Sequence, residues 1–368
     1  MGQTMRSMAW ICVLAGPALL SQSPPTGPIP RVGANSGGAS TPREYFRRLR
    51  FSPDGKYVLA QSNTGITVLS VDPFRVAFRV PAENAGDAEF TSDGHFVFLT
   101  GASHANSREL TYVNSSARVE RWSVADRSLN STEVGELACG ANGLSPDGLV
   151  VACVDFSGTL RLIDVASGQT FFEKKKFCTK IVRGSGDAMQ ISGDPGSARI
   201  DFSPDGRYMI VVPKNADGSP MAWDLRSRKR IGLKGELKSL RWATYAFAGP
   251  DRLVVSRDRQ GLVYSAWVSA IVALPSAQRI SKLNLPPGTL SRAADPGFII
   301  VQTKTWRRSF PFLAIEYRTG RTIGNETAAM DVFRDRYIVQ RPGRGLELHV
   351  DGQPVVRLGQ RNASNPRP

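Results

Sequence analysis

The chain has 368 residues, enough for two or three ordinary domains, but single all-β repeat folds reach the same length, so length alone does not require a division. Hydrophobic residues make up 41% of it and 35 glycines and 24 prolines accompany them, which suits a globular fold with many tight turns better than a helical or a disordered chain. The formal charge of +15 bears on solubility and on non-specific partners, but by itself it identifies no ligand.

The first residues are typical of a secretory signal peptide, since Arg6 precedes an apolar run from Met8 to Leu20 and small polar residues follow. This run is too short to cross a bilayer as a helix, and no later window approaches the roughly 20 residues needed, so the mature protein is expected to have no membrane span. We expect residues 1–23 to be removed on export to the periplasm or the cell exterior. Residues 24–41, rich in Pro, Gly and Ser, are expected to form a flexible lead-in.

Four segments then repeat one pattern, an apolar residue followed by Ser-Pro-Asp-Gly or a close variant and a second apolar run. They are Phe51–Leu59, Phe90–Phe98, Leu144–Val151 and Phe202–Ile210. Proline presets φ for a tight turn, aspartate can bond its own backbone, and glycine supplies the positive φ that closes a hairpin. Each segment therefore predicts two strands joined by a turn.

Weaker copies follow at Gly249–Val255, Asp295–Val301 and Phe333–Val339, and the seven copies lie about 47 residues apart on average, the length of one four-stranded propeller blade. Further strand patterns, such as Ile66–Val71, follow each turn at a similar distance. The sequence therefore predicts an all-β fold, a single β-propeller of seven four-stranded antiparallel blades over residues 42–359, followed by a loose tail over 360–368. Six or eight blades remain as alternatives, because the approach to the fourth unit is long enough for an extra hairpin.

The repeat resembles the WD-repeat superfamily, and more closely the bacterial SPDG-type repeats of TolB-like propellers, over about residues 43–358. Trp223-Asp224 is a literal Trp-Asp dipeptide, whereas the Gly-His dipeptide of eukaryotic WD repeats is missing. The resemblance implies the propeller fold and leaves the function open, because such propellers serve as scaffolds, enzymes and assembly platforms.

The repeated residues are interpreted as structural. The motif aspartates are turn formers, and Trp122, Trp223 and Trp267 occupy one strand position in their units, which indicates packing between blades. Counting four strands per blade in order leaves no exchanged terminal strand to close the ring. Either packing alone closes it or the segment near Ile29–Val32 supplies a latch.

Cysteine and histidine suggest a disulfide and no metal site. Cys139 and Cys153 flank one predicted hairpin, so they could either form a disulfide or remain two buried thiols, with Cys178 unpaired. The three histidines, His95, His104 and His349, lack metal-ligand spacing. Because nucleophile and phosphate-loop motifs are also missing, we expect no metal and no cofactor.

Basic residues gather in the loops between second and third strands, which share one face of the propeller. This face carries few acids, and an aromatic residue beside paired arginines suits stacking and bidentate contacts with an anion. The candidate ligand-binding residues are Lys214, Arg257, Arg259, Lys304, Trp306, Arg307, Arg308, Arg341 and Arg344. The alternative is that they are solvated surface cations.

The sequence therefore favours an exported, monomeric, non-catalytic scaffold that binds a protein or an anionic polymer, over an enzyme. Nucleic acid is not expected as a partner, since no recognised binding motif is present. The alternative is a propeller hydrolase or lactonase whose carboxylates converge on the central channel from separate blades and leave no local motif. That alternative predicts a cluster of acids, or a metal, at the axis.

Overall fold

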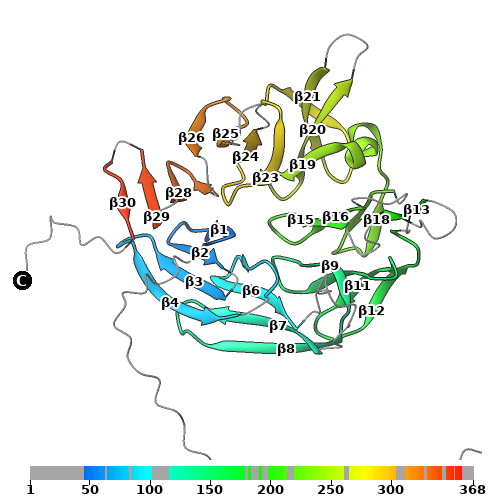
Figure 1. Ribbon diagram of the computed structural model, residues 1–368, viewed down its shortest axis with the longest axis horizontal. Helices are drawn as coiled ribbons and strands as arrows, with labels where there is room; N and C mark the ends of the chain where they lie inside the picture. The colour runs from blue at the N-terminus through cyan, green and yellow to red at the C-terminus, as the bar shows by residue number, and fades with distance from the viewer. Residues whose placement is uncertain are drawn as a thin grey trace, which may run out of the picture. The chain divides into compact units, whose positions relative to one another are not determined.

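The computed structural model describes residues 45–62, 64–82, 85–101, 116–178, 181–183, 190–192, 198–213, 219–260, 265–303, 311–326, 330–341, 345–351 and 353–358. These residues belong to one compact unit, residues 43–368. They form seven four-stranded antiparallel sheets arranged as a seven-bladed β-propeller, which confirms the predicted fold class (Figure 1). No helix in the described residues is long and apolar enough to cross a membrane.

Each blade is built from four strands that follow one another along the chain. The first three blades are β1 to β4 (Arg48–Phe51, Tyr57–Gln61, Gly65–Ser70, Arg75–Pro81), β5 to β8 (Glu89–Phe90, His95–Thr100, Ser116–Ser123, Leu129–Glu136) and β9 to β12 (Cys139–Leu144, Val150–Asp155, Leu160–Asp164, Thr170–Lys174). The other four are β15 to β18 (Ala198–Phe202, Tyr208–Pro213, Met221–Asp224, Lys229–Ile231), β19 to β22 (Ala243–Phe247, Arg252–Gln260, Ser265–Ala273, Arg279–Leu283), β23 to β26 (Gly288–Arg292, Phe298–Thr303, Phe312–Glu316, Thr322–Glu326) and β27 to β30 (Met330–Phe333, Arg336–Arg341, Gly345–Val350, Val356–Arg357). Figure 1 shows β1, β15 and β23 toward the middle of the ring and β4, β8 and β12 at its rim.

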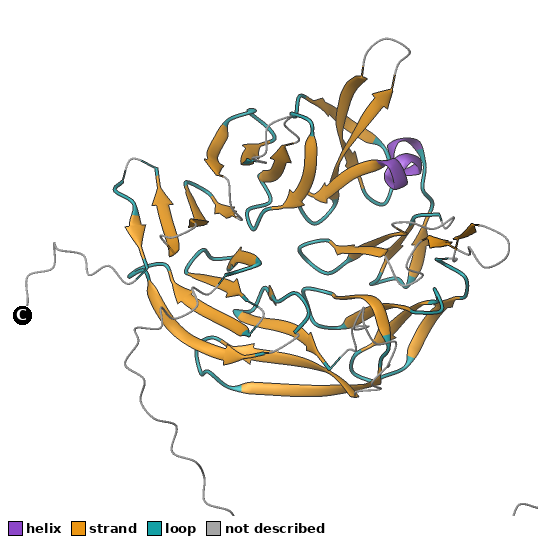
Figure 2. Cartoon of the chain, in the orientation of Figure 1, coloured by secondary structure: helices purple, strands orange, loops and turns teal. Residues whose placement is uncertain are grey.

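Two elements lie outside the blades. The long approach to the fourth blade holds a short hairpin of β13 (Ile181–Arg183) and β14 (Gln190–Ser192), which forms its own two-stranded sheet and adds no blade. A 3-10 helix, Gly235–Trp242, connects the fourth and fifth blades (Figure 2).

The Ser-Pro-Asp-Gly segments form the turns between the first and second strands. In the first blade the Ser52 hydroxyl donates to Asp54 Oδ1 at 2.6 Å and accepts the backbone N–H of Tyr57 at 2.9 Å, while Gly55 has a φ of 73°. Ser145 and Ser203 make the same pair of hydrogen bonds in the third and fourth blades. The serines are buried, so each hydroxyl satisfies a backbone donor that water cannot reach.

The core consists of clusters that join neighbouring blades. One cluster unites the third and fourth blades, and in it the buried Trp223 of β17 packs edge-on against Phe172 of β12, with ring centroids 5.0 Å apart. Trp122 of β7 stacks on Phe96 within the second blade. Neighbouring blades can share these clusters because successive side chains of a strand point to opposite faces of its blade, one toward each neighbour.

All seven four-stranded sheets take their strands in chain order, so in the described residues the seventh and first blades are joined by side-chain contacts and not by an exchanged strand. The Phe51 N–H donates to Asp331 Oδ2 at 2.8 Å, the Phe46 N–H donates to Gln340 Oε1 at 2.9 Å, and the rings of Phe51 and Phe333 lie 6.1 Å apart. The alternative latch, Ile29–Val32, lies outside the described residues.

A disulfide joins Cys139 and Cys153, whose Cα atoms lie 5.5 Å apart on the two inner strands of the third blade. It fastens the first strand of this blade to the second. Cys178 is buried and takes no part in the bond.

Candidate functional site

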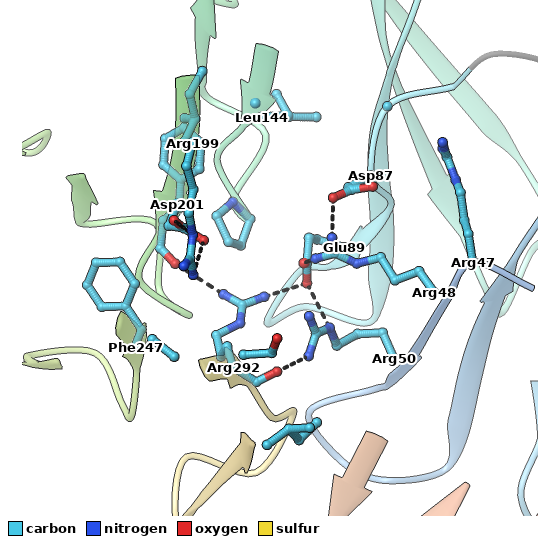
Figure 3. Close-up of a pocket in the computed structure, with 18 of the residues that line it drawn as sticks. Arg47, Arg48, Arg50, Asp87, Glu89, Leu144, Arg199, Asp201, Phe247 and Arg292 are labelled. Carbon is cyan, nitrogen blue, oxygen red and sulfur yellow. Dashed lines mark hydrogen bonds and ion pairs between the residues drawn. The ribbon is translucent and has the colours of Figure 1, made fainter. Parts of the chain in front are cut away.

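A cavity of about 320 Å³ lies where the first strands of the blades meet, and residues from all seven of these strands line it. We call it the central cavity. Its charged lining residues are Arg47, Arg48, Arg50, Asp87, Glu89, Arg199, Asp201 and Arg292 (Figure 3). Five arginines therefore face three carboxylates among the described residues.

Strand alternation brings the arginines of β1 to this cavity. Leu49 and Phe51 point into the core shared by the first and seventh blades, so Arg48 and Arg50 point the other way and line the cavity.

Glu89 of the second blade is the centre of an ion-pair network. Its carboxylate pairs with Arg48, with Arg292 at 2.5 Å and with Arg50 at 3.5 Å, and its side chain is only 11% exposed. Burial alone would raise the pKa of Glu89, but the guanidinium groups of Arg292, Arg48 and Arg50 outweigh burial and lower this pKa to about 2. Glu89 is therefore ionised at physiological pH.

Arg292 spans the cavity from the sixth blade. It pairs with Glu89 of the second blade, donates to the Phe202 carbonyl of the fourth at 3.3 Å, and its own carbonyl accepts from Arg50 at 2.8 Å (Figure 3). Burial, together with the charges of Arg50 and Arg48, lowers the pKa of Arg292 from its usual value, despite the opposing effect of Glu89. The site therefore disfavours an additional positive charge.

Asp331 is an acid beside this network, and its carboxylate accepts hydrogen bonds from backbone N–H groups. Its carboxylate is fully buried, accepts the N–H groups of Phe51 at 2.8 Å and Ala294 at 2.9 Å, and lies 3.6 Å from Arg50. Burial raises the pKa of Asp331, although Arg50 and the N–H groups act in the opposite direction. This residue joins the first, sixth and seventh blades.

A second ion pair lies on another part of the wall. Arg199 pairs with Asp201 at 2.7 Å, donates to the Tyr245 carbonyl at 2.7 Å and lies over the Tyr245 ring, 4.2 Å from its centroid. Burial, reinforced by Asp201, raises the pKa of the Tyr245 hydroxyl well above its usual value, so this phenol stays neutral.

The pairing of its carboxylates with arginines determines which chemistry the central cavity can support. Every carboxylate that lines it is paired with an arginine, as Asp87 and Glu89 are with Arg48 and as Asp201 is with Arg199. Within the described ranges, no three His, Cys, Asp or Glu side chains form a group that could hold a metal. The acidic cluster that a channel hydrolase would need is therefore not found in this part of the chain, and the charge balance favours binding an anion.

The structure describes the side chains of two of the predicted ligand-binding residues, and both are paired. Arg257 lies 3.3 Å from Glu236, and Arg341 lies 2.9 Å from Glu326 and 2.7 Å from Glu347. They belong to the fifth and seventh blades, and each pairs with different acids. For Arg259 only the backbone, in β20, is described. Lys214, Lys304, Trp306, Arg307, Arg308 and Arg344 lie outside the described residues.

The prediction from sequence missed the arginines of the cavity, although the repeat contains a signal for them. When the four strong repeats are aligned on the apolar residue before the turn, the position one before it holds Arg50, Glu89, Gly143 and Asp201. The position three before it holds Arg48, Asp87, Ala141 and Arg199. Charge at these two positions varies between blades, and six of these eight residues are the paired charges described above.

No protein-family model matches the chain, and no curated protein matches it in sequence. Among solved structures it is similar to hydrazine synthase of Kuenenia stuttgartiensis, with a TM-score of 0.52 and 9% identity over 87% of this chain and 99% of that one. It is also similar to the β-propeller domain of Cps50 (Swd1) from Myceliophteria thermophila, with a TM-score of 0.50 and 12% identity over 83% of this chain and 96% of that one. At such identities these likenesses show the fold alone.

Proposed function

We propose that this protein is an exported, monomeric β-propeller of the SPDG type that binds an anionic polymer without catalysing a reaction. The observation that carries the proposal is the excess of arginines over carboxylates in the central cavity, where every lining acid is already paired. A fixed positive field in a partly enclosed site attracts anions and raises their local concentration.

Export is part of the proposal and rests on the sequence alone. Residues 1–23 have the charged start, apolar run and small-residue end of a signal peptide. Expression of the full chain in a bacterial host, followed by fractionation and mass determination, tests it. A shortened protein in the periplasm or the medium is expected, and a full-length protein in the cytoplasm would contradict export.

Binding is tested with the purified protein against acidic and neutral polysaccharides and cell-envelope fractions, at low and high salt. Saturable binding to an acidic polymer that weakens in high salt is expected, because exposed charges are screened. Failure to bind any acidic polymer at low salt would refute the proposal.

The contribution of the basic loops is tested separately. A protein carrying Arg307→Ala and Arg308→Ala is expected to bind the acidic polymer more weakly if these loops form part of the contact. Unchanged binding would leave the central cavity as the place where the polymer is held and would remove the loops from the proposal.

A further inference from the structure

We infer that the central cavity is a binding site for a small organic carboxylate, held by Arg48, Arg50 and Arg292. This inference deepens the proposed function, because a carboxylate-bearing unit or chain end of an acidic polymer would be one source of such a ligand.

The three guanidinium groups have far more donors than the described residues around them have acceptors. Together they carry about fifteen N–H groups, of which five donate to Asp87, Glu89 and two backbone carbonyls. Among the described residues, the buried Nε atom of Arg48 has no hydrogen-bond acceptor, and the buried Nε atom of Arg50 has only the Glu89 carboxylate at 3.5 Å. Because an unpaired buried donor costs free energy, an added acceptor at this place would be favourable.

The charge of the network is also incomplete. Only two of its acids, Glu89 and Asp331, are buried, since the side chain of Asp87 is 61% exposed and water screens it. Asp331 is bound by backbone N–H groups, and burial raises its pKa. Three arginines thus lie beside two buried acids, and burial, together with the charges of Arg50 and Arg48, lowers the pKa of Arg292.

The existing contacts indicate which anion fits. Arg48 and Arg292 already hold the carboxylate of Glu89, and a guanidinium fork matches a planar carboxylate well. A second carboxylate could bind the edges of these groups that Glu89 leaves unused.

The rest of the cavity indicates that the carboxylate belongs to an organic molecule. Its volume of about 320 Å³ is at the lower end of the range for small-molecule sites, roughly 300–1,000 Å³, and exceeds what one inorganic anion would fill. Ile200 and Phe312 line the cavity, are half-buried and add apolar surface to its wall. The ligand class is therefore a compact carboxylic acid with a carbon skeleton that can contact these side chains.

The experiment is calorimetric titration of the native protein with four probes at low salt. Glucuronate and N-acetyl-alanyl-alanine represent the two sources of a carboxylate, a sugar acid and a peptide end, whereas glucose and inorganic phosphate are the comparisons. Saturable binding of either carboxylate, with neither glucose nor phosphate as tight, is expected. If no carboxylate binds, or if phosphate binds equally well, the inference is overturned.

Variants locate the site. Arg50→Lys keeps the charge but loses the planar fork, and is expected to weaken carboxylate binding at least about tenfold, the loss of one charge-assisted contact. Arg121→Lys is the matched control, because Arg121 pairs with the solvent-exposed Asp93 in the second blade and does not line the cavity, and unchanged affinity is expected. Equal losses in both variants would contradict the assignment to the cavity.

A cavity-filling variant covers the case in which Arg50→Lys fails to fold. Ser291 is exposed and lines the cavity, so Ser291→Phe adds bulk without removing a charge, and it is expected to abolish carboxylate binding. Undiminished binding would place the carboxylate elsewhere. Polymer binding without carboxylate binding would refute this inference alone, and carboxylate binding without polymer binding would refute only the proposed function.

Discussion

Glu89 and Asp93 lie four residues apart in the second blade, and the pKa of each is lowered to about 2, yet for different reasons. Burial would raise the pKa of both. Asp93 is half exposed in the turn after β5, where Thr91, Arg121 and His95 of its own blade overcome that effect. Glu89 is 11% exposed in the central cavity, and the arginines that overcome its burial come from the sixth and first blades.

The comparison separates two kinds of residue in a repeat protein. The turn is maintained by neighbours in sequence, so the same solution recurs in several blades, as with Ser52, Ser145 and Ser203. The cavity network is assembled once, from different blades, at positions where the repeats differ. Repeated residues thus maintain each blade, whereas residues that vary at equivalent positions give the propeller an individual site.

The largest expected effect follows from replacing Glu89, which is the buried one of the two acids Glu89 and Asp93. Glu89→Ala leaves Arg48, Arg50 and Arg292 without their common buried acid, and should lower the free energy of unfolding by about 3–5 kcal/mol. Asp93→Ala should cost about 1 kcal/mol or less, because its ion pair is exposed to solvent. Urea denaturation of both variants measures the difference, and equal losses would show that the cavity network is no more important to stability than a turn.

Much of the architecture was predictable from the sequence because its signals are local. Proline, aspartate and glycine within four residues determine a turn, so the all-β class, the seven blades and the consecutive strands followed from the repeat. The cavity was not predicted, because Arg48, Glu89 and Arg292 are as much as 244 residues apart and only ring closure brings them together. The basic loops were predicted from charge alone, whereas Arg257 and Arg341 have acidic partners on other elements of the fold.

The same two acids should respond differently to pH. Because the folded pKa of Glu89 is below its usual value of 4.5, Glu89 stabilises the fold above pH 4.5, and this contribution is lost as the pH falls toward 2. Between pH 6 and 3 the loss should be about 2 kcal/mol, seen as a smaller pH dependence of unfolding in Glu89→Gln than in the native protein. Asp331 has a raised pKa and acts in the opposite direction, but it is common to both proteins and cancels in the difference.

Asp93→Asn is the control for this pH profile. The pKa of Asp93 is lowered as far, but solvent screens its ion pair, so its replacement should flatten the profile less than Glu89→Gln does. If Asp93→Asn flattened the profile more, the turns and not the cavity would dominate the response to acid.

The smallest expected effect comes from replacing a serine of the repeated turn, which does not line the central cavity. Ser203 is buried, donates to Asp205 at 2.6 Å and accepts the Tyr208 N–H at 2.8 Å, so Ser203→Ala leaves a buried donor unpaired and should cost about 1.5 kcal/mol. Ser167→Ala, in an exposed turn of the third blade, should change stability by less than about 0.5 kcal/mol. Carboxylate affinity should stay unchanged in both variants, because neither serine lines the central cavity. A loss of affinity in Ser203→Ala without loss of stability would mean that the turn and the cavity are coupled, and the division between repeated and individual residues would then fail.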